Sequence, residues 1–263
     1  MPRFAANLSF LYGEFDFLDR FAAAAADGFQ GVEFLFPYEY PAAAIAKRLR
    51  GAQLEQVLFN LPPGDWAAGE RGLAALPGRE AEFAAALELS LDHAQALGCR
   101  RLHAMAGIVA PAADRARMHA VYVANLRLAA RRAAEHGIRV LIEPINARDM
   151  PGYFLSTLAQ AAAVIAEVGE PNLRLQFDLY HAQVSEGDLT RKLERYLPIT
   201  GHVQVASVPA RAEPDSGELD AARVFAQLEA LGYEGWVGCE YRPRAGTRAG
   251  LGWFAPWRAR TGG

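Results

Sequence analysis

Four polar side chains stand at the ends of four successive apolar runs in the second half of the chain. They are Glu143 in VLIEPIN, Asp178 in LQFDLYH, Gln204 in GHVQVAS and Glu240 in VGCEYRP. Buried parallel strands are almost purely apolar, so carboxylates and an amide at strand ends are unusual and indicate a specific role for these side chains. If the four runs are neighbouring parallel strands, we expect these side chains to converge at one edge of the sheet.

Three carboxylates in one pocket require a counter-charge. Two unit charges about 4 Å apart cost on the order of 4 kcal/mol at an effective dielectric of about 20. Three carboxylates and one amide oxygen form a ligand set that suits Mg²⁺ or Mn²⁺ better than zinc. The alternative counter-charge is arginine, and Arg148, Arg211 and Arg242 all lie near strand ends. Arginine pairing is the simpler interpretation for any one position, whereas the four positions together favour a divalent metal.

Two histidines lie close to these positions. His181 follows Asp178 by three residues, and His202 precedes Gln204 by two, which places it on the same strand face as Gln204. Either histidine could orient a substrate or a metal ligand, or could simply be hydrogen-bonded to backbone in the core. Pocket-lining candidates of lower rank near the ends of earlier strands are His103, Asn60, Glu33 and Asn7.

The elements that must position these residues follow a regular rhythm of short β-rich runs and longer alanine-rich segments. Strands are predicted at 3–9, 31–36, 54–60, 100–107, 138–145, 173–180, 201–207 and 236–241. Helices are predicted at positions that include 16–28, 79–98, 121–137, 157–169 and 220–233. Eight β-then-α units in a chain of this length predict a single (β/α)₈ TIM barrel. The runner-up is an open doubly wound sheet, which requires a glycine-rich phosphate turn where this chain has FLYGEF.

One domain over residues 1–263 is the simpler organisation, because the chain has no internal repeat, low-complexity tail or Pro/Ser-rich linker. The connection at 61–80, LPPGDWAAGERGLAALPGRE, is longer than the usual barrel loop. Connections of this length in compact domains are typically lids or binding loops. We therefore expect an active-site loop at 61–80.

Composition excludes several classes of protein. The chain is 52% hydrophobic and 22% charged, which is typical of a globular domain, and no apolar run is long enough to span a membrane. The first residues do not resemble a secretory signal, and two widely spaced cysteines indicate reduced thiols, so we expect a cytoplasmic protein. A net charge of -3 predicts no general affinity for nucleic acid. A homo-oligomer stays possible.

The ordered motifs LIEPIN, FDLYHAQ, GHVQVA, EPDSGE and GCEYRP resemble the hydroxypyruvate isomerase family of xylose-isomerase-like TIM barrels. The similarity includes ANLSFLYGEFDFLDRF, FPYEY and NLPPGDWAAGERG, and so covers essentially the whole chain. It implies a metal-assisted aldose–ketose isomerisation of a small hydroxylated oxo acid. The implied pairs are hydroxypyruvate with tartronate semialdehyde, or 2-oxo-tetronate with 3-oxo-tetronate in a sibling group.

The resemblance also implies roles for the four strand-end residues. Glu143 and Glu240 match the family's two acid/base glutamates, which also bind the metal, and Asp178 and Gln204 match its remaining two ligands. Many relatives in the wider superfamily have histidine where this chain has Gln204, which agrees with the isomerase branch and not with the epimerase branches. One glutamate would act as the base that removes a proton to form an enediolate, and the other would act as the acid that delivers a proton to the adjacent carbon.

Substrate binding and rival functions complete the sequence-based expectations. Arg211 or Arg148 is the first candidate to anchor the substrate carboxylate, with His181, His103 and Asn60 as further substrate-binding candidates and the 61–80 loop above them. The nearest rival is a ketose 3-epimerase on the same scaffold. A more distant rival is an endonuclease IV-like DNA repair enzyme, against which six histidines and a slightly acidic chain argue. A non-catalytic sugar-acid binding protein is the third.

Overall fold

Eight parallel strands close into a barrel in chain order in the computed structural model, which describes residues 2–258. β1 pairs with β2 on one side and with β8 on the other, which closes the ring. The strands are β1 (Arg3–Asn7), β2 (Gly31–Glu33), β3 (Glu55–Asn60), β4 (Arg101–His103), β5 (Arg139–Ile142), β6 (Leu173–Asp178), β7 (Thr200–Val205) and β8 (Trp236–Cys239). The predicted (β/α)₈ architecture is confirmed.

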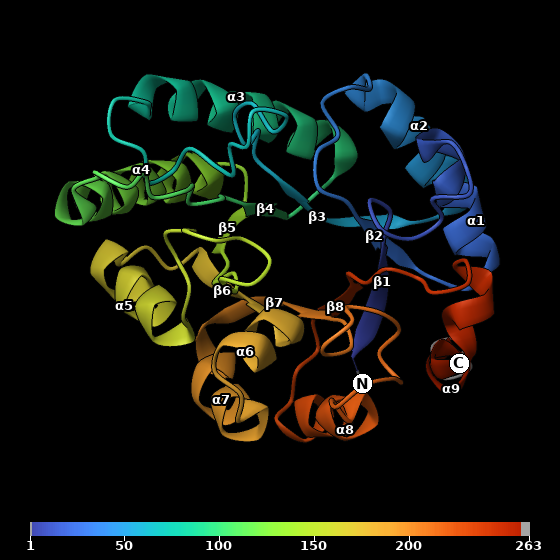
Figure 1. Cartoon of the computed structure of the whole chain (residues 1–263). Coiled ribbons are helices and arrows are strands. Elements are labelled where there is room, and N and C mark those ends of the chain that lie inside the picture. The colour runs from blue at the N-terminus through green and yellow to red at the C-terminus, as the bar shows by residue number, and fades with distance from the viewer. Residues whose placement is uncertain (1, 259–263) are drawn as a thin grey trace.

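Helices surround the barrel (Figure 1). They are α1 (Arg20–Ala26), α2 (Ala42–Ala52), α3 (Glu80–Leu97), α4 (Arg115–Ala134), α5 (Leu158–Val168), α6 (Leu179–Ser185), α7 (Leu189–Tyr196), α8 (Ala221–Ala230) and α9 (Ala255–Arg258). Short 3₁₀ helices lie at Phe17–Asp19, Leu197–Ile199 and Arg248–Phe254. α4 begins earlier than the predicted 121, because the Asp114 side chain accepts hydrogen bonds from the backbone N–H groups of Ala116 and Arg117.

Several predicted strands end sooner in the structure than in the prediction. β5 stops at Ile142, two residues before Pro144, which has no N–H to donate to a sheet. Glu143 therefore lies just beyond its strand, as Glu240 lies just beyond β8. Asp178 is the last residue of β6, and Gln204 lies within β7.

The strand register brings polar residues to one level of the barrel. Asp178 pairs with Gln204, and Gln204 pairs with Gly238. Gly238 leaves room at this level for the Glu33 carboxylate, since a Cβ atom there would lie 2.3 Å from both oxygens of Glu33. The absence of a side chain at Gly238 thus allows a carboxylate from β2 to cross the barrel interior.

An apolar plug fills the barrel near the starts of the strands. It consists of the buried side chains Ala5, Val57, Leu58, Leu141 and Trp236. A Cβ atom on Gly31 would lie 2.8 Å from the Trp236 ring, so the indole occupies the space that a larger residue would need. Trp236 begins β8 and Glu240 follows its end, so the plug and the polar residues lie at opposite ends of the barrel.

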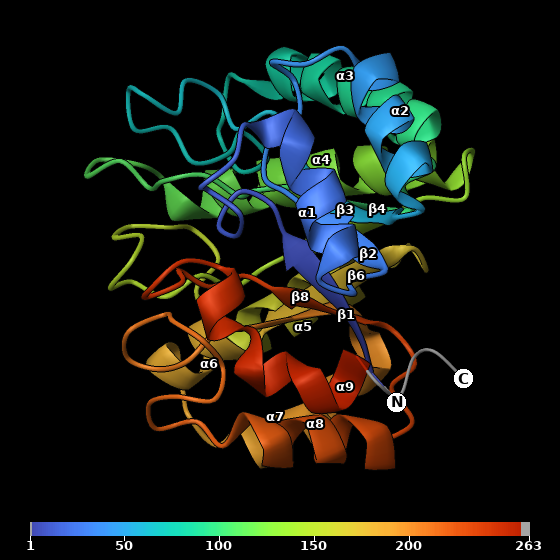
Figure 2. The ribbon, with the colours of Figure 1, turned by 90° about the vertical axis from the view of Figure 1, so that its right-hand side faces the viewer.

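The connection from β3 to α3 contains neither a helix nor a strand, and it is fastened to the segment after β4. Gly72 forms an antiparallel bridge with Ala106, and the backbone N–H of Ala74 donates to the Met105 carbonyl. Figure 2 shows this loop and the loop after β7 extending on the same side of the barrel. Among residues 2–258, no helix is long and apolar enough to cross a membrane.

Candidate active site

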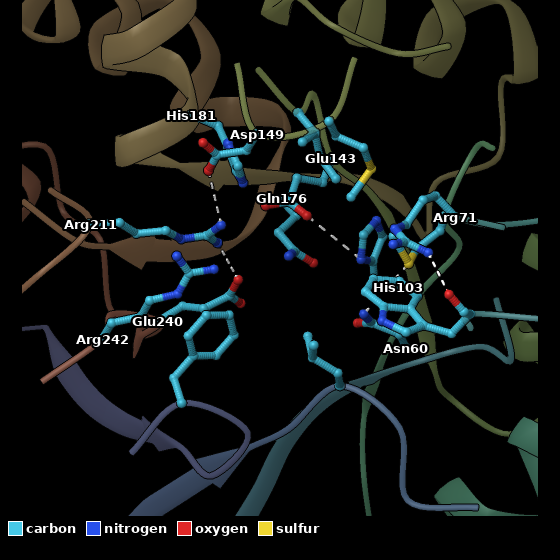
Figure 3. A pocket seen from close by; sticks show the side chains of 16 residues that line it. Asn60, Arg71, His103, Glu143, Asp149, Gln176, His181, Arg211, Glu240 and Arg242 are labelled. Atoms are coloured by element: carbon cyan, nitrogen blue, oxygen red, sulfur yellow. Dashed lines mark hydrogen bonds and ion pairs between the residues drawn. The ribbon is translucent and has the colours of Figure 1, made fainter. Parts of the chain in front are cut away.

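The carboxyl ends of the strands surround a cavity of about 370 Å³, a size typical of small-molecule sites. Six of the residues predicted from the sequence line it (Figure 3): Asn60, His103, Glu143, His181, Arg211 and Glu240. Asp178 and Gln204 are buried beside these residues. Arg148 is exposed and does not line the cavity.

The carboxylates of Glu143 and Asp178 lie next to the imidazole of His181. One potential ligand atom from each of the three residues lies within 4.8 Å of the other two. Burial raises the pKa of Glu143 well above its usual value, and the nearby charges of Asp178 and Glu240 raise it further. Burial also raises the pKa of Asp178, although Arg211 and two backbone N–H groups oppose the rise. Both carboxyl groups therefore bind protons tightly unless a cation stabilises the charged form.

Gln204 connects Glu240 to the polar layer beneath the cavity. Its Nε2 atom donates to Glu240 at 2.6 Å and to Glu33 at 2.8 Å. Asn7 also donates to both carboxylates. His202 Nε2 lies 2.7 Å from Glu33 Oε2, so this histidine supports Glu33 and does not line the cavity. Burial raises the pKa of Glu240 to about 8, against the opposing effect of Arg211.

Arg211 supplies the positive charge that the structure places among the carboxylates. Its guanidinium donates to Glu240 at 2.5 Å and to Asp149 at 3.2 Å, and it lies 3.9 Å from Asp178. Burial alone would lower the pKa of Arg211, but the neighbouring carboxylates outweigh it and the pKa is raised. Arg211 adopts a left-handed backbone conformation, φ 52°, in the loop after β7. A strained position of this kind at a cavity is typical of functional residues.

The site also fits a divalent cation. Glu143 Oε1 is buried and has no hydrogen-bond partner among the described residues. Glu143, Asp178 and Glu240 carry three negative charges when ionised, and Arg211 balances one of them. Because Arg211 also pairs with Asp149, the three carboxylates keep an excess of negative charge that a divalent cation can offset, and carboxylate oxygens are the ligands that hard cations prefer. The arginine and metal interpretations of the sequence are therefore compatible with each other.

Hydrogen bonds to His181 fix which of its nitrogens carries the proton. Nδ1 faces the Asn146 side-chain amide at 2.6 Å and the Asn146 backbone N–H at 3.4 Å. The Asn146 Oδ1 atom is used elsewhere, because it accepts from the backbone N–H of Asp149. Nδ1 is therefore the acceptor, and in the neutral ring Nε2 carries the hydrogen. Burial lowers the pKa of His181 well below its usual value, so the ring is a neutral donor near Asp178.

Several residues of the cavity were not predicted from the sequence. Gln176 donates from Nε2 to Gln204 Oε1 at 2.7 Å, and its own Oε1 is buried without a partner. Strand alternation could have found it, because Gln176 precedes Asp178 by two residues on β6. Arg71 and Asp149 line the cavity from loops. No sequence signal distinguishes these two from solvated loop residues.

Comparison with known proteins identifies the family. A family model described as "Xylose isomerase-like TIM barrel" matches residues 21–257. "2-oxo-tetronate isomerase" of Cupriavidus necator is 58% identical over 260 residues, which are 99% of this chain and 100% of that protein. "Hydroxypyruvate isomerase" of Escherichia coli is 46% identical over 258 residues, 98% and 100% of the two chains.

A solved structure is also similar over its full length. The crystal structure described as "AP endonuclease, family 2" from Brucella melitensis is 54% identical and superposes with a TM-score of 0.97. The match covers 98% of this chain and 100% of that one. With an eight-stranded barrel, a carboxylate-rich cavity at its carboxyl end and matches along nearly its whole length, this chain belongs to the xylose isomerase-like TIM barrel family.

Proposed function

We propose that this chain is a divalent-metal-dependent isomerase that moves a carbonyl between adjacent carbons of a small hydroxylated oxo acid. Its substrates are hydroxypyruvate and tartronate semialdehyde, or the 2-oxo-tetronate and 3-oxo-tetronate pair. The assignment as an isomerase rests on full-length similarity to proteins of that name. The observation that carries the chemistry is a pair of buried glutamates with raised pKa values at one cavity, Glu143 and Glu240.

Glu143, Asp178, Gln204 and Glu240 would hold the metal. Mg²⁺ or Mn²⁺ suits this oxygen donor set. When bound, the cation stabilises the negative charge that develops on the two adjacent substrate oxygens. We assign His181 to the substrate and not to the metal, because its Nε2 carries a hydrogen and can donate to a substrate oxygen.

The two glutamates move the protons. Glu143 and Glu240 reach the cavity from different strands and different sides (Figure 3). One carboxylate takes the proton from the hydroxylated carbon, which leaves an enediolate. The other, in its acid form, delivers a proton to the neighbouring carbon, while the hydroxyl proton passes to the former carbonyl oxygen. In the metal-free site both carboxyl groups have raised pKa values and so hold a proton more readily than a free glutamate does, and a bound cation would oppose this shift.

The proposal places this activity in the cytoplasm, in keeping with two buried, unpaired cysteines, Cys99 and Cys239. It requires only a small-molecule partner. Two statements stay predictions: the protein does not bind nucleic acid, and it can form a homo-oligomer.

Turnover measured by ¹³C NMR tests the proposal. The protein is loaded with Mg²⁺ or Mn²⁺ and incubated with hydroxypyruvate and with 2-oxo-tetronate, each with and without excess chelator. We expect a moved carbonyl on at least one substrate and loss of turnover with chelator. An inverted carbinol carbon with an unmoved carbonyl would identify a 3-epimerase instead, and turnover insensitive to exhaustive chelation would refute the metal.

A second candidate follows from the Brucella melitensis structure described as an AP endonuclease. Among residues 2–258, the group of His, Cys, Asp or Glu side chains that could hold a metal is Glu143, Asp178 and His181, and the isomerase proposal uses the two carboxylates of this group for its own metal. The chain carries a net charge of -3, which does not favour a DNA backbone. Incubation with an abasic duplex distinguishes the two functions, since the isomerase proposal predicts no strand cleavage.

A further inference from the structure

Arg71 brings to the cavity a positive charge that no carboxylate among the described residues neutralises. It lies in the loop between β3 and α3 and lines the cavity on the same side as Asn60 and His103, across from Arg211 and Glu240 (Figure 3). Arg71 forms no ion pair within 4 Å in residues 2–258. The adjacent Glu70 is not available to it, because both of its oxygens accept from Arg79, at 2.6 and 3.2 Å.

The loop holds the Arg71 guanidinium in a fixed position. Nη1 donates to the carbonyls of Trp66 and Glu70 at 2.9 and 2.7 Å. The guanidinium lies 3.8 Å from the centre of the Trp66 ring, which in turn packs against Phe36. The following residue, Gly72, is bridged to Ala106. Nη1 is thus occupied by backbone, while Nε and Nη2 form no hydrogen bond to any described residue.

The opposite side of the cavity is unsuited to a substrate carboxylate. Arg211 donates there to Glu240 and Asp149, so its charge is already shared by protein carboxylates. Arg242 lines the same side without an ion pair among residues 2–258, but it is exposed and lies beside Glu240 (Figure 3). A substrate carboxylate on that side would have to compete with Glu240 and Asp149 for the Arg211 guanidinium. On the Arg71 side the cavity is lined instead by Asn60 and His103 (Figure 3), and neither is a carboxylate.

We propose that Arg71 binds the substrate carboxylate through its Nε and Nη2 edge and selects oxo acids over uncharged sugars. The inference rests on the proposed function for its substrate class, and it replaces Arg211 and Arg148 as the anchor. The free edge of a guanidinium matches a carboxylate with two parallel hydrogen bonds. The reacting carbons then extend from Arg71 toward Glu143 and Glu240.

Turnover of a charged substrate and of its uncharged counterpart tests this role. Hydroxypyruvate is compared with dihydroxyacetone, in which a CH₂OH group replaces the carboxylate. For Arg71→Met we expect kcat/KM for hydroxypyruvate to fall about 10- to 100-fold, mainly through KM, and the preference over dihydroxyacetone to fall equally. Arg71→Lys, which keeps the charge but loses the two-pronged edge, should recover part of the loss. A larger effect from Arg242→Met than from Arg71→Met would overturn the proposal.

A binding measurement separates this inference from the proposed function. Calorimetry of D-glycerate and glycerol on the metal-loaded protein requires no turnover. The expected result is an about 10-fold or greater weakening of glycerate binding by Arg71→Met, and no change for glycerol. If this result is found but no isomerase activity is detected, the carboxylate site stands and the proposed function fails. Unchanged glycerate binding in Arg71→Met refutes the carboxylate site whatever the activity.

Discussion

Replacing Arg211 should change stability and metal affinity in opposite directions. In Arg211→Met the stem of the side chain is kept and the charge is lost. Arg211 is 11% exposed and donates to Glu240, whose side chain is 9% exposed, at 2.5 Å. Breaking a buried pair of this kind costs about 3–5 kcal/mol, since the partner charge stays buried. We therefore expect the metal-free variant to unfold more easily by about this amount at high pH.

The size of that loss depends on pH in a defined direction. Burial already raises the pKa of Glu240 to about 8, and removing Arg211 raises it further. A carboxyl with a raised pKa in the folded state binds its proton more tightly there than in the unfolded chain. Stability is therefore lost as pH rises from about 4.5 toward 8 and beyond, because the folded protein must give up that proton. The free energy of unfolding of the variant should be close to that of the wild type near pH 5 and well below it near pH 9.

A divalent cation should restore the stability that Arg211→Met loses. The guanidinium and the cation both carry positive charge close to Glu240 and Asp178 and therefore repel each other. Without Arg211 we expect Mn²⁺ to bind at least about tenfold more tightly, a gain of about 1.4 kcal/mol. Thermal unfolding across pH and calorimetric Mn²⁺ titration measure both effects, with Arg242→Met as the matched control on the same cavity. If Arg211→Met lowers both the stability and the Mn²⁺ affinity, Arg211 organises the site and does not compete with the cation.

Three further predictions concern the cation site and its support. Mn²⁺ affinity should rise by at least about tenfold per pH unit below about pH 8, because the protons held by Glu240 and Glu143 compete with the metal. Calorimetry in buffers of different ionisation enthalpy should detect proton release on binding, and pH-independent affinity would contradict this competition. Gln176→Met should weaken Mn²⁺ binding about 10-fold or more, since the buried Gln176 Oε1 can accept the Gln204 N–H when the Gln204 carbonyl turns to the cation. Calorimetric titration measures this effect, and an unchanged titration would exclude the role. Gly238→Ala should destabilise the protein by about 1–3 kcal/mol in urea unfolding, because its Cβ would lie 2.3 Å from the Glu33 carboxylate, and wild-type stability would contradict that packing.

The barrel and the strand-end residues were predictable because they depend on local patterns. Strand alternation and chain order alone bring Asp178 and Gln204 into register on β6 and β7. Pro144 restricts the residue before it to extended conformations, which fixes Glu143 at the mouth of the barrel. These features need no knowledge of loop conformation, so sequence reasoning reached them.

The loop residues were not predictable because long-range contacts set their positions. After β5, the Asn146 side chain accepts from the Asp149 N–H, and this turn places Asp149 on the cavity while Arg148 is exposed. The position of Arg71 depends on the bridge between Gly72 and Ala106, a residue far away in the sequence. The counter-charge among the carboxylates likewise depends on the left-handed backbone of Arg211. No periodicity in the sequence encodes these contacts.

Turnover of the metal-loaded protein in D₂O shows whether Glu143 and Glu240 move the protons of the isomerisation. Wild type, Glu143→Gln and Glu240→Gln are compared on hydroxypyruvate and 2-oxo-tetronate by ¹H and ¹³C NMR, with bound metal measured on the same samples. We predict that the wild type moves the carbonyl and introduces solvent deuterium on carbon, and that each variant loses about 10²–10⁴-fold in kcat even at saturating metal. Full turnover in either variant with metal bound would contradict the claim that one glutamate removes the proton from one carbon and the other delivers a proton to the adjacent carbon.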